Sequence, residues 1–201
     1  MSRFHRIAQV CCLMILVGRG CDTTGLFSMQ QYDSTKEELK AATQILANQE
    51  MQKVAFLIGT WVASDVYEKT PLTPDGGSGS GIYKTIPGPG GFSLLTDYQH
   101  EGPRGIASGH QVLTWDPEQR QYAGIIVTGT SAGYILVTGK WEGPNLVLSG
   151  KFETLRKKVV FREVFSGISA AKMMLQQYNS INGARPQLFG TTKFTRASSK
   201  E

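Results

Sequence analysis

The sequence predicts an all-β protein: a single antiparallel up-and-down β-barrel of about ten strands, preceded by one amphipathic helix. From residue 57 onward, short β-prone runs alternate with turns that contain Gly, Pro, Asn or Asp. No helical pattern separates these runs, which disfavours a parallel sheet because parallel strands need long crossover connections. The chain also contains 23 glycines, and glycine is better tolerated in turns, bulges and barrel corners than in helices.

The first twenty residues have the layout of a secretory signal peptide. Arg3 and Arg6 give a positive start, and a mostly apolar run from 7 to 18 follows that is too short to span a bilayer comfortably. Cys21 comes next and resembles a bacterial lipoprotein processing site, although Arg19 stands where such sites usually have a small uncharged residue. We therefore expect a signal peptide at 1–20 and export to the periplasm or cell envelope. Lipidation of Cys21, with membrane attachment, and simple cleavage nearby both stay open.

The cysteines and the charge of the chain agree with removal of this segment. All three cysteines (Cys11, Cys12 and Cys21) lie at or before the expected junction, so the mature domain has none for a disulfide. Three arginines within the first twenty residues account for most of the formal charge of +5, and the remainder has 18 basic and 16 acidic residues. The one basic cluster, at 156–158, has the position of a hairpin turn. No nucleic-acid partner is expected.

A tether at 21–33 and a helix at 34–56 precede the strands. Ser34 and Glu37 have the spacing of a capping box, in which each side chain caps the other's backbone amide. Apolar residues including Leu39, Leu46 and Met51 then recur at roughly helical spacing. The apolar stripe of this helix is expected to lie on the barrel or to plug one of its ends.

Ten strands are predicted in the remainder, at 58–68, 80–87, 92–100, 107–115, 121–129, 134–141, 145–153, 158–167, 172–180 and 187–196. The Gly/Ser stretch at 70–81 is interpreted as a rim loop. A β-sandwich is the competing arrangement. The even spacing of the turns and the lack of cysteines favour a barrel, which removes the edges of a long meander by closure.

Both faces of the predicted strands carry apolar and polar residues. Phe161, Glu163 and Phe165 share one face of their strand, for example, while Arg162 lies on the opposite face. This mixture is typical of a barrel interior that is partly filled and partly polar. It does not show which face points inward.

Short motifs in order along residues 50–197 resemble those of the DUF1579 family and, more broadly, of the calycin superfamily. They are Leu57-Ile58-Gly59-Thr60-Trp61 at the first strand, a central hairpin from Gly109 through Trp115-Asp116 to Tyr122, and Phe194-Thr195-Arg196 at the end. The resemblance implies a calycin-like β-barrel over 57–197. It also implies a structural cation–π contact between Trp61 and Arg196 that closes one barrel end. Calycin barrels commonly bind hydrophobic small molecules inside.

The sequence gives little support to a cofactor, a metal or catalysis. Nitrobindin-like barrels bind haem through a histidine near the C-terminus, and no histidine follows His110, so no cofactor is expected. His100 and His110 flank one hairpin, with Asp97 opposite His110 in one register and His100 opposite it in another, but two donors make a poor metal site in either. Asp97 with His110, or Glu163 with Arg162, could form an acid–base pair inside a cavity, but the adjacent residues Arg162 and Glu163 point to opposite faces of a strand. No known catalytic motif is present, so the protein is not expected to be an enzyme.

Two functions remain, a ligand-binding barrel and a structural or interaction domain of the cell envelope with a filled barrel and a protein partner. The first, binding of a small apolar or amphipathic molecule, is favoured. Its candidate ligand-binding residues sit mid-strand in polar-rich rows: Tyr98, His110, Trp115, Tyr134, Arg162 and Tyr178. Interior size distinguishes the two, because a barrel is filled if its large residues all point inward: Phe92, Phe152, Phe161, Phe165, Met173 and Leu175.

Overall fold

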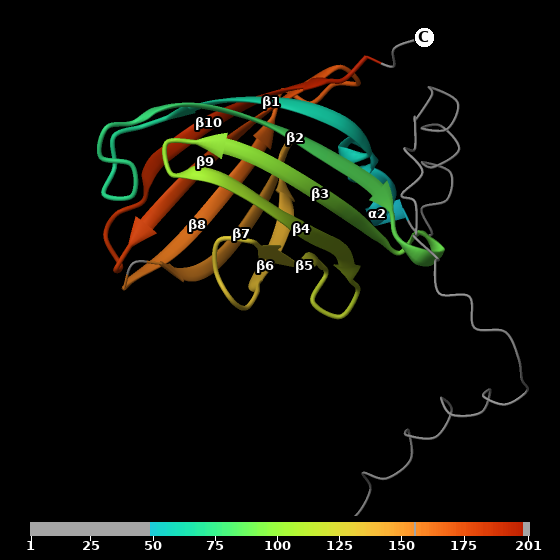
Figure 1. Ribbon diagram of the computed structural model, residues 1–201. Coiled ribbons are helices and arrows are strands. Elements are labelled where there is room, and N and C mark those ends of the chain that lie inside the picture. The colour runs from blue at the N-terminus through green and yellow to red at the C-terminus, as the bar shows by residue number, and fades with distance from the viewer. Residues whose placement is uncertain (1–48, 155, 199–201) are drawn as a thin grey trace, which may run out of the picture. The chain divides into compact units, whose positions relative to one another are not determined.

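Ten antiparallel strands form one closed β-barrel in the computed structural model, which describes residues 49–154 and 156–198 (Figure 1). Each strand pairs with the next along the chain, and pairing of the first with the last closes the barrel. The predicted fold class is confirmed. The strands are β1 (Gly59–Tyr67), β2 (Gly77–Pro87), β3 (Ser93–Gly102), β4 (Gly105–Asp116), β5 (Gln121–Thr128), β6 (Ile135–Glu142), β7 (Asn145–Thr154), β8 (Lys157–Ser166), β9 (Lys172–Ile181) and β10 (Gln187–Arg196).

The predicted rim loop at 70–81 is too long, because its last part is the beginning of β2. Gly79 pairs with Asp65 of β1, and Gly81 pairs with His100 of β3. A Cβ atom on Gly81 would lie only 3.2 Å from the Cα and Cβ atoms of His100. The glycines therefore allow the backbone of β3 to approach closely within the sheet rather than marking a loop.

One end of the barrel is closed by α2 (Gln49–Lys53) and the 3-10 turn η1 (Ala55–Leu57). Met51 and Val54 are fully buried, whereas Gln52 and Lys53 are exposed, so this segment is amphipathic as predicted. Its helix ends at Lys53 rather than at residue 56. The earlier part of the predicted helix, the tether and the signal peptide lie outside the described residues.

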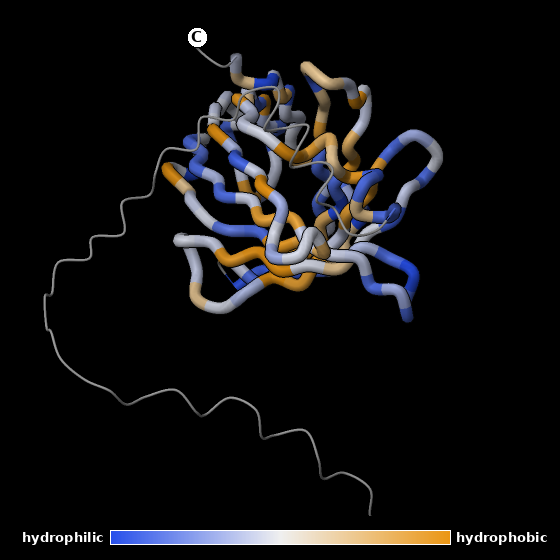
Figure 2. The backbone as a smooth tube through the Cα atoms, turned by 90° about the vertical axis from the view of Figure 1, so that its right-hand side faces the viewer, coloured by the Kyte–Doolittle hydropathy of each residue, from blue (hydrophilic) through white to orange (hydrophobic). Residues whose placement is uncertain are grey.

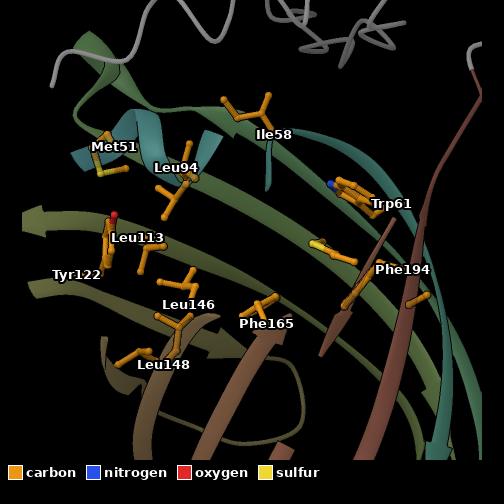
Figure 3. Close-up of a cluster of buried hydrophobic side chains, with 14 of the residues drawn as sticks. Met51, Ile58, Trp61, Leu94, Leu113, Tyr122, Leu146, Leu148, Phe165 and Phe194 are labelled. Atoms are coloured by element: carbon orange, nitrogen blue, oxygen red, sulfur yellow. The ribbon is translucent and has the colours of Figure 1, made fainter. Parts of the chain in front are cut away.

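A cluster of buried apolar side chains fills the closed end, to which α2 contributes Met51 and the strands contribute Leu94, Leu113 and Leu146 (Figure 3). Tyr122 donates to the Glu50 carbonyl at 2.8 Å and accepts from Trp141 Nε1 at 3.1 Å. These contacts join the helix to the barrel wall.

Trp61 and Arg196 lie opposite each other on β1 and β10, at the same closed end. The Arg196 guanidinium carbon is 4.1 Å from the centroid of the Trp61 ring. The guanidinium also donates to the carbonyls of Ile58 (2.6 Å), Phe56 (3.2 Å) and Ala170 (2.6 Å). The contact expected from the family resemblance is therefore present, together with three hydrogen bonds to the segments that it joins.

Apolar and polar residues alternate along the strands (Figure 2). On β8, Val159, Phe161 and Phe165 are buried, whereas Val160 and Arg162 between them are exposed. Inside and outside, which the sequence leaves open, are thus assigned. Within the described part of the chain, no helix has the length and apolar character needed to span a bilayer.

Candidate functional site

The barrel holds two adjoining chambers between the closed end and the opposite mouth. The deep chamber has a volume of about 250 Å³ and reaches Trp61 and Leu57. The mouth chamber has about 350 Å³ and reaches the turn between β3 and β4 at Pro103 and Arg104. Together they fall in the range of roughly 300–1,000 Å³ that is usual for small-molecule sites. Eight residues line both chambers and form what we call the shared ring: Tyr67, Tyr98, His100, Ala107, Ile126, Glu163, Gln177 and Phe189.

Asp65, His100 and Tyr67 form a hydrogen-bonded cluster at one side of the cavity. His100 Nε2 lies 2.9 Å from Asp65 Oδ2 and 2.6 Å from the Tyr67 hydroxyl, and the other Asp65 oxygen accepts from Thr192. An ionised carboxylate can only accept, so with Asp65 ionised the Nε2 proton points toward it. The Tyr67 oxygen then lies beside the same N–H as a second acceptor, which leaves the Tyr67 proton available as a donor.

The alternation of β1 and a bulge in β10 bring this cluster together. Trp61 faces inward, so Ala63, Asp65 and Tyr67 face inward too. The register between β9 and β10 shifts between Leu188 and Gly190, and this bulge brings Phe189 into the cavity wall. The Phe189 ring then packs edge-on against Tyr67 with ring centroids 5.5 Å apart.

A pair of stacked tyrosines lies next to the cluster. The rings of Tyr83 and Tyr98 are 5.5 Å apart and tilted by only 18°. Burial raises the pKa of both hydroxyls, and the Glu163 charge adds to each shift. Both tyrosines therefore stay protonated at neutral pH. Gly109 gives Tyr98 its space, because a Cβ there would lie 2.5 Å from the Tyr98 oxygen.

Glu163 is the carboxyl group of the shared ring and has no partner of its own. No hydrogen bond or ion pair joins it to any other described residue. Its partners in strand register are Leu148 of β7 and Gln177 of β9, and the Gln177 amide nitrogen donates to Asn179 instead (3.0 Å). Glu163 is not fully enclosed, and because it lines both chambers, its remaining exposed surface faces the cavity. Burial raises its pKa to about 7.

The structure separates the six candidate ligand-binding residues. Tyr98 alone among them lines the cavity. Trp115 packs on Tyr122 at the closed end, with ring centroids 5.1 Å apart. Tyr134 is exposed near the mouth, where β6 begins. None of these placements tests binding itself, so the role of Tyr98 stays a prediction.

The other three candidates lie on strand faces turned away from the cavity. His110 pairs in register with Asp97, as one predicted alignment has it, and its Nδ1 lies 2.6 Å from Asp97 Oδ1. Both side chains are mostly exposed, so this pair is not inside the barrel. Arg162 bonds to Glu142 at 2.7 Å on the surface, and Tyr178 lies opposite Arg162 on β9.

The six large residues that would fill the barrel if all pointed inward do not fill it. Phe92 is 60% exposed. The other five all line the chambers, and space remains between them: Phe152, Phe161, Phe165, Met173 and Leu175. Among the described residues, no three His, Cys, Asp or Glu side chains gather closely enough to hold a metal ion.

Sequence reasoning missed Asp65 and Tyr67 as members of a site, and it considered Glu163 only as an acid–base partner of Arg162, which lies on the opposite face of β8. Two signals could have found them. Alternate residues of a strand share a face, so an inward Trp61 places Asp65 and Tyr67 on the inner face as well. A buried aspartate needs a partner. Glu163 lies between Phe161 and Phe165 on one face, so an inward Phe161 implies an inward Glu163.

The chain matches over residues 47–196 the family described as "Protein of unknown function (DUF1579)". Two solved structures are similar to the barrel. The S-type phycobiliprotein lyase CPES from Guillardia theta has a TM-score of 0.54 and 9% identity, covering 80% of this chain and 98% of that one. The protein Rv2717c from M. tuberculosis has a TM-score of 0.54 and 13% identity, covering 75% and 99%.

No curated protein matches the chain. At these low identities the two structures show the fold alone, a closed antiparallel β-barrel. One of them is named a lyase. The expectation that this chain is not an enzyme stays a prediction.

Proposed function

The chain belongs to the DUF1579 family, and because the description of that family gives no activity, we propose a function from the geometry: the barrel binds a small, mainly apolar molecule in its interior. The observation that carries this proposal is the pair of connected chambers within a barrel whose other end is plugged. Leu94, Leu113 and Phe165 line the deep chamber, and the shared ring adds a few polar groups. Apolar walls with few polar groups are usual in small-molecule sites.

The chambers favour this proposal over the alternative of a filled structural barrel. Solid packing of the interior would add dispersion and hydrophobic stabilisation, and an empty cavity loses it. Glu163 adds to the argument, because a buried carboxyl without a partner destabilises a purely structural core. Both features have a use if a ligand fills the space.

Mass spectrometry of the purified protein tests the proposal. The protein is extracted with organic solvent, and the extract is compared with native mass spectra of the intact chain. Ala107→Phe provides the matched variant, because Ala107 lines both chambers and a phenyl ring there would take up space in the shared ring. Ser108→Phe is the control, since residue 108 is exposed on the opposite face of β4.

We expect a discrete molecule, or uptake of one from a panel of apolar compounds, in the wild type and in Ser108→Phe but not in Ala107→Phe. An empty wild type that takes up nothing from such a panel contradicts the proposal and favours the structural alternative.

A second candidate function is catalysis, favoured by the Asp65–His100–Tyr67 cluster beside the same cavity. A histidine held by a carboxylate and a tyrosine can move a proton to or from a bound molecule. Once a ligand is identified, incubation with the protein shows whether it is converted. Conversion that is lost in His100→Gln while binding persists supports this candidate, and unchanged ligand excludes it.

Export and lipid attachment remain part of the proposal and rest on the N-terminal sequence alone. The mass of the mature protein from a bacterial host, and its place in cell fractions, test them. Cleavage before Cys21 with a mass increase that Cys21→Ser abolishes supports a lipoprotein. Retention of residues 1–20 in the cytoplasmic fraction contradicts export.

A further inference from the structure

We propose that the cavity selects amphipathic molecules whose polar end is a cationic nitrogen, such as a protonated amine, held by Glu163. This inference rests on the proposed ligand-binding function and names the chemical class of its ligand. The cation would lie at the shared ring, where Glu163 faces both chambers, and the apolar body would extend into the deep chamber.

Glu163 has no cationic partner, so its negative charge can pair with a cation on a ligand. Its own strand places Phe161 and Phe165 on either side of it, and its register partners are Leu148 and Gln177. None of these four side chains carries a charge. Burial is the one cause of its raised pKa, so no nearby cation stabilises its ionised form. A ligand can supply the missing cation.

The charged side chains that line the cavity also favour a cationic ligand. The titratable residues that line it are, besides Glu163, the following: Asp65, Tyr67, Tyr83, Tyr98, His100 and, at the rim, Arg104 and Glu153. His100 is held by Asp65, and the Arg104 guanidinium reaches toward Thr154 at the mouth (3.5 Å). The deep chamber therefore contains carboxyl groups and no lysine or arginine. A fatty-acid carboxylate placed beside the ionised Glu163 would be repelled.

The stacked tyrosine pair also favours a cationic ligand. Tyr83 and Tyr98 line the deep chamber, and the charge of Glu163 acts on both hydroxyls. Aromatic faces attract cations through their quadrupole, most strongly where water is excluded. A carboxylate and aromatic rings within reach of each other are a suitable environment for a cationic nitrogen. Glu163 is already removed from water when the barrel folds, so ligand binding adds no further desolvation of this carboxylate.

Three matched naphthyl compounds test this inference by isothermal titration of the purified protein: 2-naphthylmethylamine (cation), 2-naphthylmethanol (neutral) and 2-naphthoate (anion). At pH 8, where Glu163 is mostly ionised, we expect the amine to bind about tenfold or more tightly than the alcohol, and naphthoate to bind most weakly. As the pH falls below 7, Glu163 takes up a proton and the affinity for the amine should fall by up to about tenfold per pH unit. The affinity for the alcohol should not change.

Glu163→Gln keeps the shape of the side chain and removes its charge. In this variant the amine and the alcohol should bind within about threefold of each other. Glu142→Gln is the matched control, because Glu142 is exposed and paired with Arg162 on the outer surface, and it should keep the preference for the amine. Circular dichroism checks that both variants are folded.

The outcomes separate the two proposals. If the alcohol binds and the amine binds no more tightly, or if Glu163→Gln keeps the preference for the amine, the cation inference is wrong and the binding function stands. If none of the three compounds binds at any pH, the cation inference is wrong, and the binding function is contradicted as well if the purified protein is empty and takes up nothing from the wider panel.

Discussion

Glu163 should make the stability of the barrel depend on pH, and Glu163→Gln should remove that dependence. The pKa of Glu163 rises from an ordinary value of 4.5 to about 7 in the folded protein. Between these two values the unfolded chain has already lost the proton that the folded chain retains. The folding free energy contributed by this group is therefore largest below pH 4.5 and declines until the pH passes 7.

The size of the effect follows from the shift. Each pKa unit corresponds to about 1.36 kcal/mol, so a rise from 4.5 to about 7 corresponds to about 3 kcal/mol at most. Water entering the cavity lowers this value, because Glu163 keeps some exposed surface there. For a domain of this size, 3 kcal/mol corresponds to a shift in Tm of roughly 6–12 °C.

Urea denaturation of the wild type and Glu163→Gln between pH 4.5 and 8.5 measures the pH-dependent contribution of Glu163 to the free energy of unfolding. The difference in unfolding free energy between the two proteins isolates Glu163 from all other groups. We expect this difference to be near zero at pH 4.5 and to favour the variant by about 2–3 kcal/mol at pH 8. Glu142→Gln should show a flat difference of about 0.5 kcal/mol or less, because exposed ion pairs contribute little. A difference for Glu163→Gln that does not change with pH would refute the reasoning.

Three further substitutions test how the barrel is built, each by urea unfolding. Arg196→Lys should cost about 2 kcal/mol or more, because a single ammonium cannot reach three carbonyls and stack on Trp61; an equally stable variant would show that the contact is incidental. Tyr122→Phe should lower the free energy of unfolding by about 1–3 kcal/mol, because the Glu50 carbonyl and Trp141 lose their hydrogen-bond partner. Ligand affinity should be unchanged, since Tyr122 does not line either chamber. Gly109→Ala should cost about 1–3 kcal/mol and weaken ligand binding, because its Cβ would clash with the Val127 carbonyl oxygen and with Tyr98; unchanged stability and binding would mean that both the β5 backbone and Tyr98 have room to move.

The strands of the barrel could be predicted from sequence because their turns are marked locally. Asp116-Pro117-Glu118 and Gly143-Pro144-Asn145 each separate two β-prone runs, and strands end and begin close to both. The start of β2 was missed because Gly77–Gly81 is typical of a loop by composition. Its strand conformation depends on pairing with β1 and β3, which are distant in sequence.

The cavity could not be predicted in the same way. Its volume depends on the Cβ atoms that glycines such as Gly81 and Gly109 lack, and on the bulge that turns Phe189 inward. The Asp65–His100 contact joins β1 to β3 across the intervening strand β2, a distance that residue spacing does not reveal. Of the two registers that the sequence leaves open, the one with His110 opposite Asp97 is observed, and sequence could reach it because both residues lie within one hairpin, where the turn sets the register.

A crystal structure of the purified protein, with crystals equilibrated in 2-naphthylmethanol, tests the central claim most directly. The account predicts density for the compound inside the barrel, with its ring against Leu148 and Phe165 and its hydroxyl near Glu163. A barrel whose interior side chains pack together and leave no space for the compound would contradict the account and point to the structural alternative.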